Sequence, residues 1–459
     1  TILFVPGWSQ PVFRVPASGG TPEVVTQFNA DRLELSHRWP HLLPDGRHFL
    51  YFVVSTYPSL NPDDPSEADK SGLYLGSLDG DEPRLVHTAR SRVVYTDGSL
   101  LYVDDGILMA RPFDLETLSF TGDPVSLVEG VTQSAGALWG GALFSVSDQG
   151  TLLFVHGAPE RRVISQMQWL DREGNELEMI GGPAPYNGVR ISHGGDRVAT
   201  SIGDPGDLWI HDLDRGTSTR FTFDPGNDDY PVWSPDDEYV MFQSSRLVEG
   251  NRFVPGALFR KASSGLEPDE HVDVRSSGPI RLPADWTPDG KTVLLTEFNP
   301  GSGADILRFS IDDDSVESCV ATEGDEETPR ISPDGRWIAY DSFESGRNEI
   351  YVRAFPGPGG KWQVSTNGGQ LPAWRSDGKE LFYIGPEGLM AVPVETGGAF
   401  RHDAPVRLFE FEMRVQPDGC YVYDVGPDGQ RFLVLAPVDD AVEETGSVTL
   451  LQNWRALLD

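Results

Sequence analysis

Short apolar runs, each the length of one β-strand, alternate with polar turn segments along this chain. Residues 327–332, 337–343, 349–355 and 362–366 form one such series, and a Pro-Asp-Gly segment at 333–335 separates the first two runs. A helix would repeat its apolar residues every three to four positions over a longer stretch, and we find no stretch with that period. The pattern therefore predicts an all-β protein.

A phrase of the form apolar-Ser-Pro-Asp-Gly returns along the whole chain. Clear copies start at Trp233, Trp286, Ile331, Trp374 and Val425, an earlier copy at Leu43, and weaker copies at Thr96, Ser147 and Ile191. The Asp position of the phrase falls at residues 45, 97, 148, 194, 236, 289, 334, 377 and 428, which are 42 to 53 residues apart. A period near 45 residues with about four short strands per unit is typical of a propeller blade. The predicted fold is a β-propeller of four-stranded antiparallel blades.

The recurring aspartate of the phrase is expected to be structural. Pro presets the backbone of a tight turn, Asp bonds the backbone ahead of it, and Gly accepts a left-handed conformation. Acidic clusters at 227–229 and 312–314 could hold a calcium ion, but neither has the ligand series of an EF-hand loop. Solvated turns are the favoured interpretation of both clusters.

Nine copies of the phrase exceed the four to eight blades that are usual in one ring. The segment 156–162 is polar, contains Gly and Pro, and resembles a linker. We therefore expect incomplete propeller blades at 1–157 and a six-bladed ring at 158–459, closed by pairing of 176–180 with the last strands, including 448–454. One larger ring is the alternative. Residues 1–5 read as a strand already under way, which leads us to expect that upstream blades are missing.

The composition narrows the choice of partners. Lys and Arg number 36 against 71 Asp and Glu, a formal net charge of −35, so phosphate backbones and anionic membrane surfaces would be repelled. No apolar run approaches the ~20 residues that span a bilayer. We expect a protein partner or a small polar ligand, no nucleic acid and no membrane insertion of this segment.

Metal and cofactor signals are weak. Cys319 and Cys420 have no CxxC or Cys/His spacing that would indicate zinc. His37, His41 and His48 form the densest group of histidines, but His37 and His41 would be ~13 Å apart on a strand, too far for shared ligation unless the chain bends. We predict no metal site and no cofactor, and a structural or surface role for these histidines.

Two sets of segments carry a family resemblance. Asp229-Tyr-Pro-Val-Trp-Ser-Pro-Asp236 and Thr328-Pro-Arg-Ile-Ser-Pro-Asp-Gly335 resemble TolB-type propeller repeats. Segments 345–353 (Ser-Gly-Arg-Asn-Glu-Ile-Tyr-Val-Arg), 355–364 (Phe-Pro-Gly-Pro-Gly-Gly-Lys-Trp-Gln-Val) and 36–40 (Ser-His-Arg-Trp-Pro) resemble the propeller region that follows the kinase domain in many bacterial, eukaryotic-like serine/threonine kinases. This resemblance implies an extracytoplasmic propeller, periplasmic or at the cell surface, that senses a ligand or binds partners.

No catalytic motif accompanies the propeller pattern. The sequence has no Gly-rich phosphate loop, His-Arg-Asp loop or Asp-Phe-Gly of a kinase, and no Gly-x-Ser-x-Gly of an α/β-hydrolase. We therefore predict a non-catalytic binding or sensory module, without catalytic residues. The alternatives are a propeller lyase or hydrolase with histidines and carboxylates in the central channel, and a purely structural spacer.

Charged residues recur one position before the apolar residue of the phrase. In the proposed ring these positions are Arg190, Val232, Asp285, Arg330, Ala373 and Asp424. Asp285 is expected to face Arg330, and Asp424 to face Arg190, as two ion pairs between neighbouring blades. If the four charges lie at the channel mouth, they could instead bind a polar ligand. The apolar residues that follow them are predicted to be core: Ile191, Trp233, Trp286, Ile331, Trp374 and Val425.

Overall fold

In the part of the chain that it describes, the computed structural model consists of antiparallel sheets and a short 3-10 helix, η4 (Trp454–Leu457). It describes residues 1–7, 10–29, 32, 34, 36–55, 71–88, 91–133, 141–147, 149–156, 164–203, 205–248, 252–253, 256–275, 280–299, 303–322, 324–357, 359–411, 420–438 and 447–458. The chain forms two compact units. Unit 1 comprises Thr1–Arg162 and Val442–Asp459, and unit 2 comprises Val163–Ala441. The fold is an all-β propeller, as the sequence predicts.

Unit 2 contains six sheets of four or five strands, which we number as blades 1 to 6. Blade 1 is β17 (Tyr186–Ile191), β18 (Arg197–Gly203), β19 (Gly206–Asp212) and β20 (Thr217–Arg220); blade 2 is β21 (Asp228–Trp233), β22 (Tyr239–Ser244), β25 (Ala257–Ala262) and β26 (Glu270–Val272); blade 3 is β27 (Ile280–Trp286), β28 (Thr292–Asn299), β29 (Gly303–Ser310) and β30 (Val316–Val320). Blade 4 is β31 (Glu326–Ile331), β32 (Trp337–Ser342), β33 (Glu349–Ala354) and β34 (Lys361–Gln363); blade 5 is β35 (Gln370–Trp374), β36 (Glu380–Gly385) and β37 (Gly388–Glu395), with β38 (Arg401–His402) and β39 (Val406–Phe409) both on β37; blade 6 is β40 (Tyr423–Val425), β41 (Arg431–Pro437), β15 (Ser165–Asp171) and β16 (Glu176–Ala184). A small hairpin, β23 (Leu247–Val248) and β24 (Arg252–Phe253), extends from blade 2.

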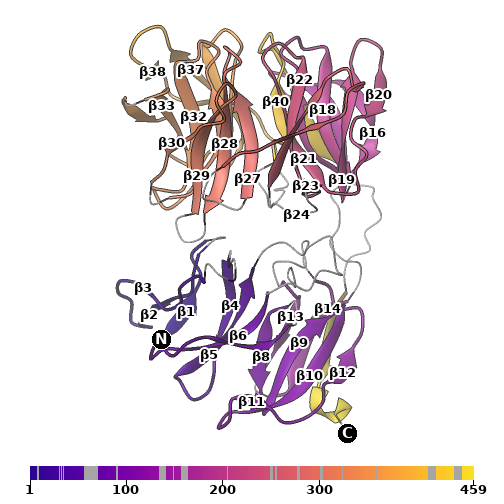
Figure 1. The fold of residues 1–459 in the computed structure, drawn as a ribbon, viewed down its shortest axis with the longest axis vertical. Coiled ribbons are helices and arrows are strands. Elements are labelled where there is room, and N and C mark those ends of the chain that lie inside the picture. Colours follow the sequence, from indigo (N-terminus) through magenta and orange to yellow (C-terminus); the bar gives the residue numbers. More distant parts are fainter. Residues whose placement is uncertain are drawn as a thin grey trace. The chain divides into compact units, whose positions relative to one another are not determined.

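Blade 6 closes the ring because it joins the first and last strands of unit 2. β15 pairs with β41 from Ser165↔Pro437 to Asp171↔Arg431. The first strands of successive blades, β17, β21, β27, β31, β35 and β40, contact one another in this order and back to β17, so they are the inner strands of the ring. In Figure 1 the yellow strand β40 lies among the magenta strands from the beginning of the unit.

The predicted closing pair was wrong. β16 pairs with β15, while the last strand, β42 (Ser447–Gln452), pairs with β14 in unit 1. The reason lies in packing: Leu451 and the fully buried Trp454 join the apolar core of unit 1. The C-terminal residues therefore belong with unit 1 rather than with the ring, and apart from His156 the expected linker at 156–162 lies outside the described residues.

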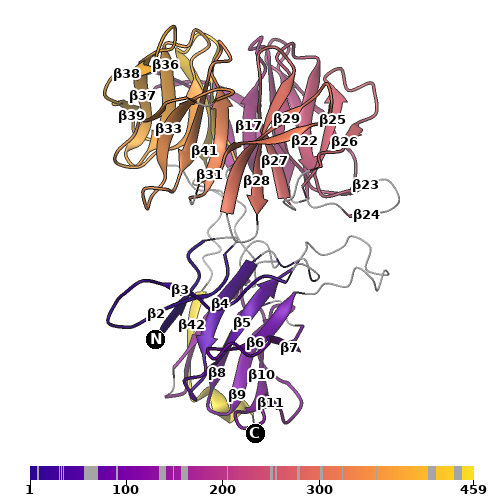
Figure 2. The same ribbon diagram turned by 60° about the vertical axis from the view of Figure 1, so that its left-hand side comes forward.

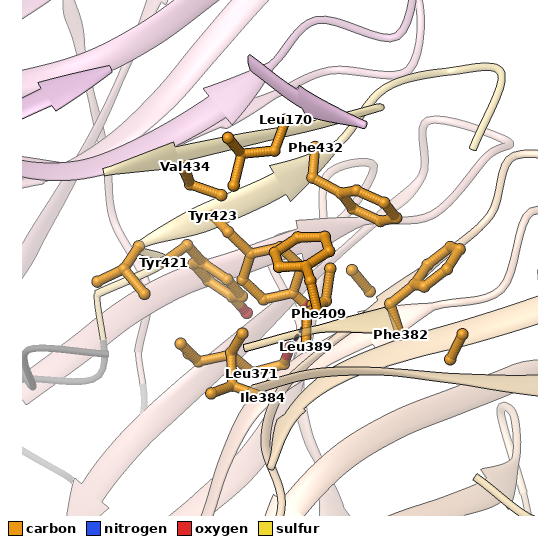
Figure 3. Packing of buried hydrophobic residues seen from close by; sticks show 13 residues of the cluster. Leu170, Leu371, Phe382, Ile384, Leu389, Phe409, Tyr421, Tyr423, Phe432 and Val434 are labelled. Atoms are coloured by element: carbon orange, nitrogen blue, oxygen red, sulfur yellow. Dashed lines mark hydrogen bonds between the residues drawn. The ribbon is translucent and has the colours of Figure 1, made fainter. Parts of the chain in front are cut away.

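An apolar cluster lies at each of the six contacts between neighbouring blades. Figure 3 shows the one between blades 5 and 6, where Phe382 and Phe432 pack at 5.1 Å between ring centroids. Of the six predicted core positions, five are at most 9% exposed and Val425 is partly buried. The core prediction is therefore confirmed.

The repeated phrase forms tight turns, as predicted. In blade 4, Asp334 Oδ1 accepts hydrogen bonds from Arg336 N (3.1 Å) and Ser332 Oγ (2.6 Å), and Gly335 has φ +70°. Asp289 binds the backbone of its own turn in the same way. Because this carboxylate satisfies the backbone of its own turn, the structural role of the turn aspartates is confirmed.

In unit 1, where Figure 2 labels strands β2 to β11 and β42, the described residues form four sheets. They are β1 (Ile2–Phe4), β2 (Phe13–Val15) and β3 (Glu23–Val24); β4 (Ser36–Leu42), β5 (His48–Val54), β6 (Gly72–Ser77) and β7 (Arg84–His87); β8 (Val93–Thr96), β9 (Ser99–Asp104) and β10 (Ile107–Asp114), with β11 (Ser119–Phe120) and β12 (Val125–Val128) on β10; and β13 (Phe144–Val146), β14 (Thr151–His156) and β42. Contacts run from β1 to β4, from β4 to β8 and from β8 to β13. Three apolar clusters fill these three contacts.

Candidate functional site

The four charged residues singled out from the sequence lie on four inner strands of the ring. Arg190 is on β17, Asp285 on β27, Arg330 on β31 and Asp424 on β40. A β-bulge precedes Asp285 and Arg330 in their strands. Because the inner strands surround the ring centre, the four side chains converge there although 234 residues of chain separate the first from the last.

The structure brings all four charges together, but in a pattern that differs from the expected one. The shortest ion pairs join blades that are two positions apart. Arg190 Nη2 of blade 1 lies 3.4 Å from Asp285 Oδ1 of blade 3, and Arg330 Nη2 of blade 4 lies 3.1 Å from Asp424 Oδ1 of blade 6. The expected Asp285–Arg330 contact is longer, at 3.8 Å. Asp424 meets blade 1 through the backbone N–H of Ile191, at 2.9 Å, rather than through the guanidinium of Arg190.

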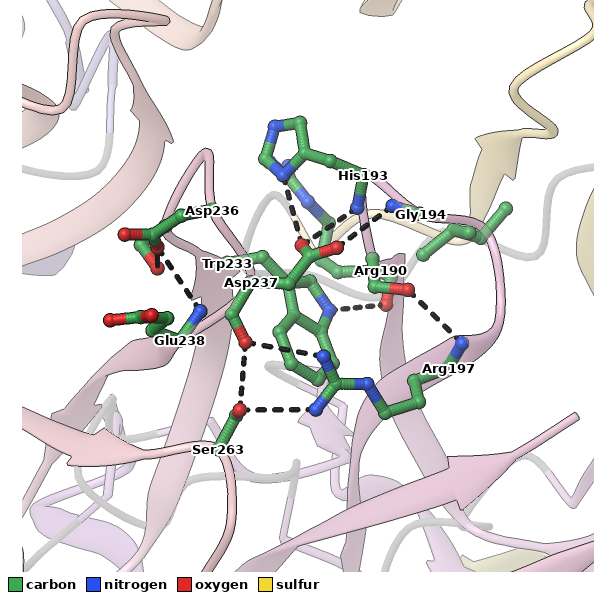
Figure 4. Close-up of polar contacts among 12 residues, drawn as sticks. Arg190, His193, Gly194, Arg197, Trp233, Asp236, Asp237, Glu238 and Ser263 are labelled. Atoms are coloured by element: carbon green, nitrogen blue, oxygen red, sulfur yellow. Dashed lines mark hydrogen bonds and ion pairs between the residues drawn. The ribbon is translucent and has the colours of Figure 1, made fainter.

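The cluster has an approximate two-fold symmetry that relates each blade to the blade three positions further around the ring, such as blade 1 to blade 4. Asp285 Oδ2 accepts a hydrogen bond from Ile331 N at 2.8 Å, just as Asp424 accepts one from Ile191 N. The indole of Trp233 donates to the carbonyl oxygen of Arg190 at 3.0 Å (Figure 4), and the indole of Trp374 donates to that of Arg330 at 2.9 Å. Each arginine is thus held through its backbone by the following blade.

Tyr421 lies between the two arginines. Its ring centroid is 4.5 Å from Cζ of Arg190 and 5.1 Å from Cζ of Arg330, distances at which a guanidinium is attracted to an aromatic face. Burial raises the pKa of Tyr421 to about 12, so its hydroxyl stays protonated at neutral pH. Figure 3 shows Tyr421 beside Tyr423 on the same segment.

The surroundings shift the pKa values of the two buried arginines in opposite directions. Burial and the nearby Arg330 lower the pKa of Arg190. Burial would also lower the pKa of Arg330, but Asp424 and Asp285 outweigh it and the pKa is raised. The difference follows the geometry, because Arg330 has a carboxylate on either side. Both guanidinium groups remain charged and balance the two carboxylates.

Three donors in the cluster have no hydrogen-bond partner among the described residues: Nη1 of Arg190, Nη1 of Arg330 and the hydroxyl of Tyr421. Arg190 and Tyr421 also line a small pocket between the inner strands, together with Gly188, Tyr230 and Pro283. A buried donor without an acceptor costs about 1–3 kcal/mol. The arrangement can therefore donate hydrogen bonds to an oxygen atom of a water molecule or a ligand.

Sequence reasoning missed Tyr421 and a second polar group, Asp341. Asp341 is on β32, is 3% exposed, and accepts a hydrogen bond from the Thr328 hydroxyl. Burial raises its pKa to about 7, although the hydrogen bonds from Thr328 and from the backbone of Leu371 favour the ionised form. Tyr423 donates to the carbonyl oxygen of the same Leu371, at 2.7 Å. Neither Asp341 nor Tyr421 belongs to the repeated phrase, so the repeat pattern gave no signal for them.

His37, His41 and His48 of unit 1 do not form a group that could hold a metal ion, among the residues that the structure describes. His37 is fully buried, with Nδ1 2.7 Å from the Thr26 hydroxyl and Nε2 3.1 Å from Glu34 Oε2. His48 contacts Asp45 in its own turn, at 2.6 Å. These contacts give both residues a structural role.

Within the described part of the chain, no group of three His, Cys, Asp or Glu residues is placed to hold a metal ion. The acidic clusters take part in internal contacts: Asp228 binds Arg246 at 2.7 Å, and Asp313 binds the hydroxyl of Ser315 at 2.7 Å. No disulfide joins Cys319 to Cys420. Among the residues that the structure describes, no helix is long and apolar enough to cross a membrane.

Comparisons with known proteins show distant similarity. No family model matches the chain. It is 23% identical over 170 residues to the uncharacterised peptidase YuxL of Bacillus subtilis, and 24% identical over 155 residues to the uncharacterised protein Atu1656 of Agrobacterium fabrum. These matches cover 29% and 26% of this chain, and they span 25% and 53% of the lengths of those two proteins.

Solved structures that resemble the chain include two TolB proteins. A TolB candidate from Agrobacterium tumefaciens is 17% identical, with a TM-score of 0.47 over 60% of this chain and 98% of its own. TolB from Acinetobacter baumannii is also 17% identical, with a TM-score of 0.40 over 70% of this chain and 80% of its own. The propeller fold itself is established here by the sheets and by their order around unit 2.

Proposed function

We propose that this chain is a non-catalytic β-propeller that acts as a binding or sensory module, the extracytoplasmic part of a larger signalling or envelope protein. The resemblance of its segments to the propeller region of bacterial eukaryotic-like kinases supports an extracytoplasmic location within a larger protein. Any kinase activity would then lie outside these residues. The partner is a protein or a small polar ligand.

One observation carries the proposal: two residues that line a pocket between the inner strands, Arg190 and Tyr421, each have a buried donor without an acceptor among the described residues. Arg190 and Tyr421 present a guanidinium nitrogen and a hydroxyl for which the described residues supply no acceptor. Asp285, Arg330 and Asp424 hold Arg190 and its neighbours in place. Because the charges already balance, the best ligand group is a neutral acceptor such as a peptide carbonyl, rather than a free anion.

The ring gives this pocket the rigidity that recognition requires. All six blade contacts are packed with apolar residues, and the inner strands form an unbroken circle. A preorganised site binds with less loss of conformational entropy than a flexible one. Loops at the ends of the blades would supply the remaining contact area with a protein partner.

The test uses peptides selected from a phage-displayed library on the immobilised chain, with affinities measured by calorimetry. Tyr421→Phe removes a hydroxyl that has no partner, so it should weaken binding about tenfold while the fold keeps or gains stability. Tyr423→Phe is the matched control, because its hydroxyl binds Leu371 inside the ring and not the pocket. It should lower the free energy of unfolding by about 1 kcal/mol and leave the affinity unchanged. Equal affinities for the wild type and Tyr421→Phe would contradict the central site.

A further inference from the structure

The outward face of the first sheet of unit 1 is entirely apolar. The pairs Ile2↔Val15, Phe4↔Phe13 and Phe13↔Val24 place five side chains on one face, since paired residues share a side of the sheet. Ile2 is 50% exposed and Val24 54% exposed, and the other three are only partly buried. The opposite face carries Leu3 and packs against the β4 sheet.

The last sheet of unit 1 has a similar face. The pairs Leu153↔Leu450 and Val155↔Val448 place four apolar side chains together. Leu450 is 56% exposed and Val448 71% exposed. The opposite face of this sheet, with Phe154, packs against the β8 sheet. Unit 1 therefore ends on both sides in a face of the kind that packs between blades.

Among the described residues, the first sheet also has one strand fewer than the four of a ring blade. In the ring, the third strands β19 and β33 share a signature in which a backbone N–H, that of Leu208 or Ile350, donates to a hydroxyl beyond the fourth strand, that of Thr222 or Ser365. Val12 N, just before β2, donates to the Thr26 hydroxyl in the same way, at 2.9 Å.

This signature identifies β2 as a third strand, and therefore β1 as a second strand. Every blade of the ring has a first strand inside its second. Among the described residues, β1 pairs with β2 alone, so its inner edge presents unpaired backbone groups. An open strand edge binds another strand.

We propose that unit 1 is a docking surface for further four-stranded blades of the same polypeptide, lying outside these 459 residues. One of their strands pairs with the inner edge of β1, and their apolar sides cover the face of Ile2 and Phe13 and the face of Leu153 and Leu450. The completed unit is a ring.

Two observations identify this occupant. The two end faces continue the three apolar contacts that already join the sheets of unit 1, so a blade of the same kind fits each of them. A segment distant in sequence already completes one of these sheets, because β42 pairs with β14 across 290 residues of chain or more. A second copy of the chain is the competing occupant.

The test compares this chain with the whole polypeptide that its gene encodes, by hydrogen exchange read by mass spectrometry. In the longer polypeptide, the edge amides of β1 should exchange at least about 100-fold more slowly than in the 459-residue chain. Amides of β41, which pair with β15 in both proteins, serve as the internal control. Equal exchange of the β1 amides, or a gene product that begins at Thr1, would overturn the proposal.

Substitutions give a second readout. Leu450→Lys should lower the melting temperature of the longer polypeptide by about 2–4 °C and leave the 459-residue chain unchanged. Met179→Lys is the control, because Met179 is 62% exposed on β16 of the ring; it should change neither protein. Light scattering of the 459-residue chain decides against the second copy if the mass is 50.4 kDa. Twice that mass, with β1 protected, would show that a second copy occupies the surface and would refute the proposal.

Discussion

The two units are built from the same kind of antiparallel sheet, but they differ in how the row of sheets ends. In unit 2, six sheets are joined by six apolar clusters, and both faces of each sheet are covered. In unit 1, four sheets are joined by three clusters among the described residues, which leaves a face open at either end. Closing a row of sheets into a ring adds one interface without adding a sheet, and it removes the two exposed faces.

Closure also decides where charge can be buried. The ion pairs at the ring centre join residues 95 and 94 positions apart, Arg190 with Asp285 and Arg330 with Asp424, because closure gathers the inner strands of all the blades around one centre. In unit 1 the buried acid Glu34 is paired with a residue three positions away, His37. The ring thus pairs these four charges over long range, whereas Glu34 in unit 1 is paired locally.

The largest effect is expected from a substitution that disrupts the interface between blades 6 and 1, where the ring closes. Trp169 on β15 is 2% exposed and packs against β17, β18 and β41. Trp169→Ala should lower the free energy of unfolding of the ring by about 3–5 kcal/mol, because it opens a cavity where the first and last strands meet. Urea denaturation followed by hydrogen exchange at β32 measures the change in the ring.

Leu450→Ala is the matched change on the open face of unit 1. Leu450 is 56% exposed, so in the 459-residue chain its truncation should change the free energy of unfolding by less than about 0.5 kcal/mol. A loss comparable to that of Trp169→Ala would mean that the face is covered in solution, and the contrast between the two units would fail.

Two buried acids, one in each unit, should contribute to the pH dependence of stability in opposite directions. Burial raises the pKa of Asp341 in the ring from 3.8 to about 7. The folded ring therefore keeps a proton on Asp341 that the unfolded chain releases, and the contribution of this group to stability falls as pH rises from about 4 to about 7. Three pKa units correspond to about 4 kcal/mol as an upper limit. Asp341→Asn should remove this dependence, measured as the urea midpoint against pH.

In unit 1 the sign is reversed. Burial would raise the pKa of Glu34, but hydrogen bonds from His37, from the backbone of Asn29 and from Arg32 lower it below 4.5. The contribution of Glu34 to the free energy of unfolding is present above pH 4.5 and is lost as the pH falls through the pKa of the folded state. The protection of β5 amides, corrected for the intrinsic pH dependence of exchange, should therefore fall in acid, and Glu34→Gln should flatten this response. A Glu34→Gln variant with the same pH dependence as the wild type would contradict the assignment.

The local structure could be predicted from the sequence because it depends on neighbouring residues. The turn phrase, with Asp334 and Gly335, sets a backbone conformation within a few positions, and the apolar residue before each turn, such as Trp233, must pack between blades. The charges at Arg190 and Asp285 could be assigned to inner strands by aligning the repeats.

The partners of those charges could not be predicted. A charged side chain at the ring centre can pair with a residue of any blade, and the distances across the ring determine which pair forms. The spacing of the repeat in the sequence gives no information about these distances. The destination of β42 was mistaken because its alternating residues fit any sheet edge, and only the burial of Trp454 decides between the two units. Tyr421 and Asp341 lie outside the phrase and carry no local signal.

The smallest effect concerns an irregular pair of turns inside the ring. In four contacts, the Gly of one turn lies against the Pro of the preceding turn, as in Gly335 with Pro288. Blade 1 has His193 and Gly194 in place of Pro-Asp, and blade 2 has Asp237 in place of Gly, at φ +58°. The Asp237 carboxylate accepts hydrogen bonds from the backbone N–H groups of His193 and Gly194, both at 2.8 Å (Figure 4).

These two irregular turns should therefore be coupled. Asp237→Gly relieves a left-handed Asp but leaves two N–H groups without their acceptor, so the free energy of unfolding should fall by about 1 kcal/mol. Adding His193→Pro and Gly194→Asp removes one of those N–H groups, supplies the usual turn carboxylate and restores a Pro–Gly contact, so the triple variant should return to within about 0.5 kcal/mol of the wild type. Additive losses in urea denaturation would show that the two turns are independent and that the closed ring tolerates each irregularity by itself.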